Sequence, residues 1–286
     1  MDYLTYWFML PISTLVATTA MLTGIGGAAI FIPIFLIVFP LLGPEYIIVG
    51  HASAIAVALL TQSFGFSSGL VRYWHRGLID VNLARRLLKI SIPLAIVGSI
   101  IAQYVTVEPF KILYALLMFS LAFLLIYNQG EIFNSIKKRF RLNDESIINQ
   151  TCLQNIQKNN LKKDKIVAGI GGMLTGITSV GIGETIMPQL FKSCKISMPI
   201  AAATSVLVVL VTIIMASLTH ILFLITNDGF DSIPWDLLVY TIPGVVIGGQ
   251  IGAKIQKDTF SEKIKKLISV LFVIIGISMM VVVFKF

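Results

Sequence analysis

The sequence predicts an all-α polytopic integral membrane protein with two inverted repeats, each made of a glycine-broken helical hairpin and three transmembrane helices. Two observations indicate the class: 56% of the 286 residues are hydrophobic, and the mean hydropathy is +0.89. A third observation indicates the architecture, because an apolar segment broken by glycines and followed by a proline occurs twice. We therefore expect a multi-pass protein of the cell membrane, with the lipid bilayer as its surroundings.

The charge content argues against a soluble protein and against nucleic-acid binding. Charged residues make up 13% of the chain, about half of the roughly 25% that is typical of soluble domains. The formal net charge is +8, but basic residues in a membrane protein mark its cytoplasmic loops. No basic stripe is interleaved with aromatic residues that would stack on bases. We expect no nucleic-acid partner.

The cysteines and the first residues of the chain lead to two further expectations. Cys152 and Cys194 lie in unrelated contexts and do not form a disulfide framework. The segment Met1-Asp2-Tyr3 lacks the basic region of a signal peptide, so we expect a retained membrane segment at the N-terminus.

Apolar blocks long enough to span a bilayer recur along the whole chain. A polar, basic stretch divides them into two groups of four. It therefore predicts a first transmembrane repeat at 1–128, a cytoplasmic linker at 129–165 and a second transmembrane repeat at 166–286. The blocks lie at about 7–42, 46–71, 87–106, 110–128, 166–191, 197–226, 235–254 and 266–284.

The two groups look like copies of one unit. The glycine-broken element occupies residues 22–33 in the first copy and 173–188 in the second, and aligning the prolines places Gly26 on Gly181. Other agreements follow in the same order at a nearly constant offset, which indicates an internal duplication. They are His51-Ala52-Ser53 with Ala203-Thr204-Ser205, Ile92-Pro93 and Gly98 with Ile242-Pro243 and Gly248, and Phe110 with Phe260.

The distribution of charge indicates that the copies are inverted. Eight single crossings would put the acidic loop around Asp231 inside and the basic loop around Lys192 outside, which violates the positive-inside rule. The first block has about 36 residues, whereas one span needs about 20. If the first and fifth blocks are hairpins, each half makes an odd number of net crossings. All basic loops and the linker then become cytoplasmic, so we favour inverted over parallel repeats.

The two glycine breaks predict a binding site. Broken backbone at membrane depth is tolerated only where protein or a water-filled cavity surrounds it, and a matched pair of breaks points to the binding site of a transporter. The first amides of each new helix lack partners, and with the helix dipole they favour a small anion. Glycine also lets a ligand approach the backbone. The candidate substrate-binding residues are Thr23, Gly24, Gly26, Gly27, Ser53, Thr178, Ser179, Gly181, Gly183, Thr204 and Ser205.

Two alternatives remain open for these residues. The glycines would also serve if they only allowed helices to pack closely. The hydroxyl groups of Ser53, Thr204 and Ser205 are weaker candidates, because hydroxyls in apolar helices often bond to the preceding turn.

Polar side chains inside the apolar blocks supply further candidates. Glu184 follows the second glycine turn directly, and an ionisable group within the membrane is a functional candidate. It would couple protons to transport by being protonated while the anion is bound, or it would cap a helix. His51 and His220 are candidates for titration near neutral pH. We expect Gln62 and Gln250 to form hydrogen bonds between helices.

Together these motifs resemble those of the TauE/SafE sulfite exporter family, also called the toluene sulfonate uptake permease family. They are the glycine-rich elements that end at Pro33 and Pro188, Ala52-Ser53 with residues 203–205, and Pro243 followed by glycines up to Gly252. The resemblance covers nearly the whole chain apart from the linker. It implies a permease for sulfite, thiosulfate or sulfonates. Ser179 and Glu184 depart from the glycines expected at their positions.

The sequence thus favours a secondary transporter of a small anion, such as sulfite or an organosulfonate, with proton coupling through Glu184. A cation transporter that uses Glu184 and unwound carbonyl groups as ligands is the alternative. A membrane-embedded enzyme is disfavoured, because the chain has no His-Glu-x-x-His motif, no nucleophile elbow and no pair of carboxylates in the apolar blocks. We expect no catalytic residue, no cofactor and no metal site.

Overall fold

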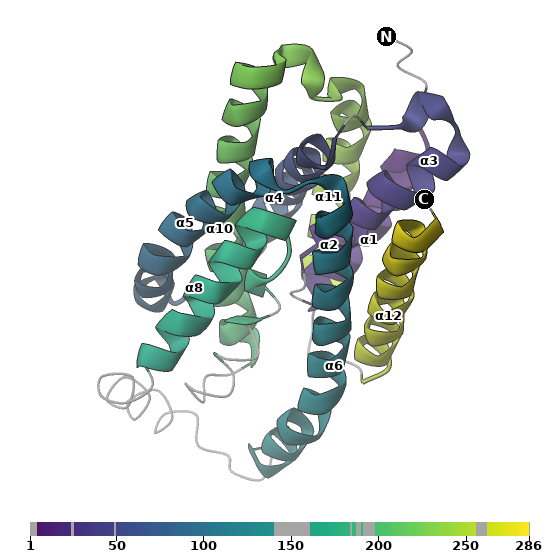
Figure 1. The fold of residues 1–286 in the computed structure, drawn as a ribbon. Helices are drawn as coiled ribbons and strands as arrows, with labels where there is room; N and C mark the ends of the chain where they lie inside the picture. Colours follow the sequence, from purple (N-terminus) through teal and green to yellow (C-terminus); the bar gives the residue numbers. More distant parts are fainter. Residues whose placement is uncertain are drawn as a thin grey trace.

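The structure is a computed structural model that describes residues 5–23, 26–48, 50–139, 161–183, 185–186, 190, 198–255 and 262–285. All regular structure in these ranges is helical, and the helices form one bundle (Figure 1). The elements are α1 (Met9–Thr23), α2 (Ala28–Pro33), the π-helix η1 (Ile34–Val38), α3 (Phe39–Leu42), the 3₁₀-helix η2 (Pro44–Tyr46), α4 (His51–His75), α5 (Val81–Tyr104), α6 (Val107–Arg139), α8 (Leu161–Thr178), α10 (Met198–Asp228), the 3₁₀-helix η3 (Phe230–Ser232), α11 (Trp235–Ile255) and α12 (Glu262–Lys285).

The helices have the lengths of a membrane protein, as the sequence predicts. Within the described residues, α4, α5, most of α10 and α11 are long and apolar enough to cross a bilayer. By contrast, α1 has 15 residues, which at 1.5 Å per residue gives about 22 Å, less than the roughly 30 Å hydrocarbon core. The helical run Ala28–Leu42 is similarly short. Neither half of the first block therefore spans the membrane by itself.

The first apolar block is a helical hairpin, which confirms the prediction. Aromatic rings close its open end: the ring centroids of Tyr6 and Phe39 lie 5.6 Å apart, and those of Phe8 and Tyr46 lie 5.8 Å apart. At the other end, a Cβ on Gly27 would lie 3.5 Å from the Cβ of Ala20. Residues just before α1 thus meet α3 and η2, because the chain reverses at the glycines.

The fifth block reverses in the same manner as far as the structure describes it. A Cβ on Gly171 would lie 3.0 Å from the Cα of Ile182 and 2.6 Å from Oγ1 of Thr185. The segment after the second break therefore runs back along α8.

The contacts between helices are unchanged when the two halves are exchanged. Helix α1 packs against α11 of the other half, and α8 packs against α5 (Figure 1). In the same way α4 contacts α11 and α10 contacts α5, while α4 meets α10 and α6 meets α12. Every one of these pairs maps onto another pair or onto itself, as a two-fold relation between duplicated halves requires. Each half therefore buries its helices mainly against the other half.

Individual side chains follow the same relation. Thr61 Oγ1 of α4 lies 3.0 Å from Thr241 Oγ1 of α11, and Ser91 Oγ of α5 lies 3.0 Å from Thr212 Oγ1 of α10. Thr61 and Thr212 are 151 residues apart, and Ser91 and Thr241 are 150 apart. Both pairs are fully buried. The two hydrogen bonds between hydroxyl groups are therefore equivalent, and each joins helices of opposite halves.

Two equivalent glycines allow close contacts between helices. A Cβ on Gly98 of α5 would overlap the carbonyl of Met173 in α8, and a Cβ on Gly248 of α11 would overlap the carbonyl of Thr14 in α1. Small residues at such crossings let backbones approach and gain van der Waals contact, which drives helix association in lipid. Close packing is therefore the role of Gly98 and Gly248, which are not among the candidate glycines of the two breaks.

Both ends of the stretch assigned to the central linker are helical. Helix α6 continues to Arg139, and α8 already begins at Leu161. Both helices thus extend into the stretch 129–165 that the sequence assigns to the linker, and the repeat boundaries remain a prediction.

Candidate functional site

The first glycine break leaves helix amides that need partners. Helix α1 ends at Thr23 and α2 begins at Ala28, with Gly26 and Gly27 buried between them. The amide of Ala28 donates to Oε1 of Gln62 in α4, at 2.7 Å. Ala29 and Ile30 donate to the carbonyls of Gly26 and Gly27 in a tight turn. The Gln62 side chain therefore caps the new helix from a neighbouring helix, as an amide without an intrahelical partner requires.

A second side chain, that of Tyr114, supplies the hydrogen bond that the same helix lacks at its proline. Pro33 has no amide hydrogen, so the carbonyl of Ala29 lacks its usual donor four residues later. The next amide, that of Ile34, donates to its own regular acceptor, the carbonyl of Ile30, and does not serve Ala29. Tyr114 of α6, which is fully buried, donates from its hydroxyl to the Ala29 carbonyl at 3.0 Å. The π-helix η1 begins directly after this proline.

The second break is held by its own hydroxyl groups. Ser179 and Gly181 have φ angles of 59° and 139°, in the region that favours glycine. Thr175 Oγ1 accepts a hydrogen bond from the Ile182 amide at 2.9 Å and so caps the restarted helix. The hydroxyls of Thr178 and Thr185 donate to the carbonyls of Leu174 and Gly181, respectively. These groups stabilise the turn, which is the capping role that threonine and serine commonly have.

A buried histidine forms a hydrogen bond to the backbone near the second break. Gly176 lies in the last turn of α8, where carbonyls have no helical donor. His220 of α10 donates from Nε2 to this carbonyl at 2.9 Å, and its Nδ1 accepts from Nε2 of Gln103 at 2.7 Å. With both ring nitrogens used in this way the imidazole is neutral. His220 is fully buried and bridges α5, α8 and α10.

The structure separates the predicted site residues into two groups. Gly26 and Gly27 lie at the first break, Thr178, Ser179, Gly181 and Gly183 lie at the second, and Thr23 is the last residue of α1. Gly24 and Glu184 lie outside the described residues.

The remaining three lie at the starts of α4 and α10. Ser53 donates to the carbonyl of Ser232 at 3.0 Å, Thr204 accepts from the amide of Asp80 at 3.0 Å, and Ser205 donates to Ala202 at 2.8 Å. Ser53 is nine positions before Gln62, about 13 Å along the helix at 1.5 Å per residue. These hydroxyls tie the ends of α4 and α10 to loops and backbone.

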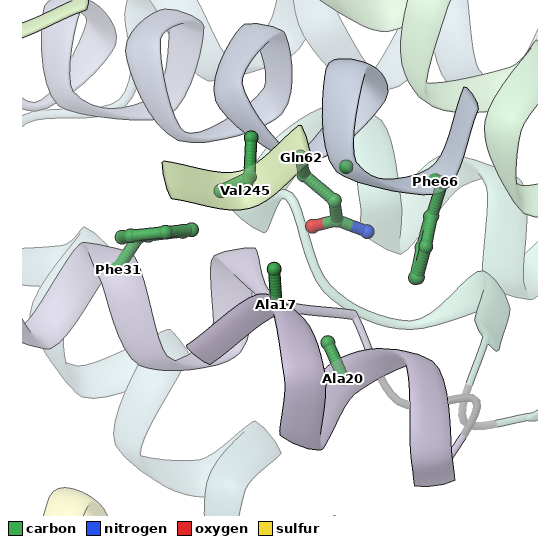
Figure 2. A pocket seen from close by; sticks show the side chains of 8 residues that line it. Ala17, Ala20, Phe31, Gln62, Phe66 and Val245 are labelled. Carbon is green, nitrogen blue, oxygen red and sulfur yellow. The ribbon is translucent and has the colours of Figure 1, made fainter. Parts of the chain in front are cut away.

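A small hollow lies beside the first break (Figure 2). Its cavity volume is only about 10 Å³, and the value rises to about 210 Å³ only when the open solvent at its mouth is included. Apart from Gln62 its walls are carbon, and two of its lining residues are the glycines Gly27 and Gly65. The other side chains come from α1, α2, α4 and α11 and are Ala17, Ala20, Phe31, Phe66 and Val245.

Sequence reasoning found some of these groups and missed others. Gln62 and Gln250 do form the expected hydrogen bonds between helices, the latter to the Ser68 carbonyl at 2.6 Å. The place of Gln62 at the break was not predictable, because the only signal is a polar residue inside an apolar block. Tyr114 gave no signal at all, since tyrosine is common in membrane helices. Among the described residues no group of three His, Cys, Asp or Glu side chains is arranged to hold a metal ion.

Comparison with known proteins gives one match. A family model described as Sulfite exporter TauE/SafE matches residues 9–279, nearly the whole chain. No curated protein and no solved structure matches the chain.

Proposed function

This chain belongs to the Sulfite exporter TauE/SafE family, and we propose that it is a secondary transporter that moves a small sulfur oxyanion or organosulfonate, such as sulfite, across the cell membrane. The observation that carries the proposal is the family match over 9–279, which includes both broken helices. The family consists of transporters, which supports a permease and not an enzyme. Broken helices in corresponding positions of two halves are what transporters use to bind a substrate.

The proposed binding region comprises the two breaks. Its candidate residues are Thr23, Gly24, Gly26 and Gly27 in the first half, and Thr178, Ser179, Gly181 and Gly183 in the second. Ser53, Thr204 and Ser205 are left out of this proposal, because their hydroxyls bond to the ends of α4 and α10.

We further propose that the halves are inverted and that the basic loops and central linker face the cytoplasm. The exchange of partners between α1–α11 and α8–α5 supports a two-fold relation. The positive-inside distribution of lysine and arginine favours an axis in the plane of the membrane over one along its normal.

Proton coupling is proposed to run through Glu184, which lies outside the described residues. A carboxylate beside an anion is tolerated only when it is protonated. Binding of the anion would therefore favour uptake of a proton, and its release would favour loss of the proton. In the Glu184→Gln variant we expect transport to lose its dependence on a pH gradient.

The test is flux in proteoliposomes made with the purified full-length chain. Vesicles are loaded with sulfite, and efflux is followed with and without an imposed pH gradient, beside vesicles without protein. We expect protein-dependent efflux that the gradient accelerates for the wild type and leaves unchanged for Glu184→Gln. The same assay is repeated with methanesulfonate and with a cation as the load. If neither sulfite nor methanesulfonate moves but a cation does, the alternative in which Glu184 is a cation ligand is favoured.

A further inference from the structure

A buried histidine supplies the donor that the end of α8 lacks. The carbonyl of Gly176 would accept from the amide of Val180 if α8 continued, but Ser179, with a φ of 59°, turns the chain out of the helix. His220 of α10 donates from Nε2 to this carbonyl at 2.9 Å. Because a carbonyl can only accept, Nε2 must carry the hydrogen, and Nδ1 of the neutral ring accepts from Gln103 of α5 at 2.7 Å. The neighbouring helices therefore fix both the position and the tautomer of the imidazole.

This hydrogen bond lies next to the cap of the restarted helix. Thr175, the residue before Gly176, accepts from the amide of Ile182 at 2.9 Å. Gly176 is also held closely against α5, because a Cβ there would overlap the carbonyl of Ala95. Helices α5, α8 and α10 lie side by side at this place (Figure 1). A shift of the last turn of α8 would carry Thr175 with it and displace the amides of the second break, which are the groups proposed to bind the anion.

The first half closes the corresponding place without polar side chains. The offset of 151 residues between α4 and α10 pairs His220 with Gly69. The offset of 150 residues between α5 and α11 pairs Gln103 with Ala253. The side chain of Met21 fills the space beside Gly69, because a Cβ on Gly69 would overlap its Cε atom. The fold can therefore close this place with apolar atoms. An ionisable side chain at the same place in the second half is a candidate for function, since such groups are costly within a membrane.

We propose that His220 is a positioning residue of the transporter, which holds the second break in the geometry that binds the substrate by donating from Nε2 to the Gly176 carbonyl. This inference rests on the proposed transport function and gives a role in it to a residue outside the two breaks. Without the donor the buried carbonyl would be unpaired, which is costly, so the end of α8 would rearrange. The fraction of the protein that is ready to bind would fall, and the apparent affinity for the substrate would fall with it.

Two substitutions separate the donor from the ring. The amide nitrogen of glutamine is as many bonds from Cα as Nε2 of histidine, so His220→Gln keeps a donor for Gly176. The amide of asparagine is as many bonds from Cα as Nδ1, so His220→Asn keeps a polar group towards Gln103 and loses the donor to Gly176. The matched control is His51→Asn. It removes a comparable bond, from Nε2 of a buried histidine to the Ala102 carbonyl at 3.2 Å, at the end of α5 and not at a break.

The assay is the initial rate of sulfite efflux from proteoliposomes with the full-length chain at a series of internal concentrations, beside thermal unfolding in detergent. We expect His220→Asn to raise the KM at least about fivefold, as the loss of a partner for a buried acceptor implies. Its maximal rate should stay within about twofold of the wild type, because saturating substrate draws the protein back into the binding geometry. His220→Gln should keep the KM within about twofold of the wild type, because its amide still donates. His51→Asn should lower Tm about as much as His220→Asn does and leave the KM unchanged.

His220→Met replaces His220→Asn if the latter does not fold, because it introduces the side chain that fills this place in the first half and has no donor. The same rise in KM is expected. A wild-type KM in the variant without a donor, with only Tm lowered, would show a purely structural role and overturn the inference. An equal rise in KM in His220→Gln or in His51→Asn would overturn it as well, and so would a fall in maximal rate at an unchanged KM. All of these outcomes leave the transport function intact. A wild type that moves neither sulfite nor methanesulfonate would overturn the proposed function and this inference with it.

Discussion

Tyr114→Phe removes the hydroxyl that replaces the helical donor missing at Pro33. The Ala29 carbonyl, 3.0 Å from Tyr114 Oη, would then be a buried acceptor without a donor. Such a loss costs about 1–3 kcal/mol in soluble proteins, and hydrogen bonds between membrane helices average about 0.6 kcal/mol with a maximum near 1.7. We therefore expect a destabilisation of about 1 kcal/mol, which corresponds to a fall of about 2–4 °C in Tm by the scaling known for chains of 150–250 residues.

A double-mutant cycle with Pro33→Ala isolates the cause. An alanine at this position restores an amide hydrogen that can donate to the Ala29 carbonyl, so the tyrosine hydroxyl is no longer needed. In the Pro33→Ala background, Tyr114→Phe should cost less by at least about 0.5 kcal/mol, which is the range of coupling between contacting residues. The assay is thermal unfolding of the four purified proteins in one detergent.

The matched control is Tyr73→Phe in α4. Tyr73 is 2% exposed, and its hydroxyl has no hydrogen-bond partner in the part of the chain that the structure describes. Removing this hydroxyl should leave stability unchanged or raise it, because no bond is lost. The reasoning is refuted if Tyr114→Phe costs the same in both backgrounds, or if it costs no more than Tyr73→Phe.

Three further results are expected. Ser179→Gly should raise the free energy of unfolding by up to about 1 kcal/mol and so raise Tm, because a φ of 59° strains any residue with a Cβ. A fall in Tm would mean that hydrogen bonding of the serine hydroxyl outweighs the strain. Gly98→Ala and Gly248→Ala should each destabilise by about 1–3 kcal/mol through overlap with a facing carbonyl, and unchanged melting of either would contradict the tight crossing. In a background without native cysteines, cysteines placed at Lys192 and Asp231 should react with a membrane-impermeant thiol reagent from opposite faces of the membrane; labelling from one face would exclude inverted repeats.

The sequence was sufficient for the class, the duplication and the hairpin of the first block. A hydropathy of this size leaves no alternative to a membrane protein, and residues 7–42 are too long for one crossing, so the reversal at the glycines follows. The aromatic contacts between Tyr6 and Phe39 confirm that reversal. The sequence also found the two breaks, because glycine followed by proline is unusual inside an apolar segment.

The partners of the broken backbone were not predictable. Ser53 and Thr204 looked similar to the hydroxyls of the breaks, yet they bond to Ser232 and Asp80 at the ends of helices in the other half. Gln62 was recognised only as a polar group that bonds between helices, and its contact with Ala28 spans 34 positions of sequence. In the same way, nothing near His220 in the sequence indicates the Gly176 carbonyl.

The sequence by itself therefore determined what is local or cumulative: total hydropathy, the length of each apolar block, the periodic return of glycine and proline, and the charge of the loops. Only the tertiary structure decided which side chains satisfy the amides and carbonyls that the breaks expose. The physical reason is that a break creates unpaired backbone groups at membrane depth, where no water is present to bind them. Their partners are whichever polar atoms the packing of α4, α6 and α10 brings within hydrogen-bond distance. That packing depends on the interlocking of both halves, and no single segment encodes it.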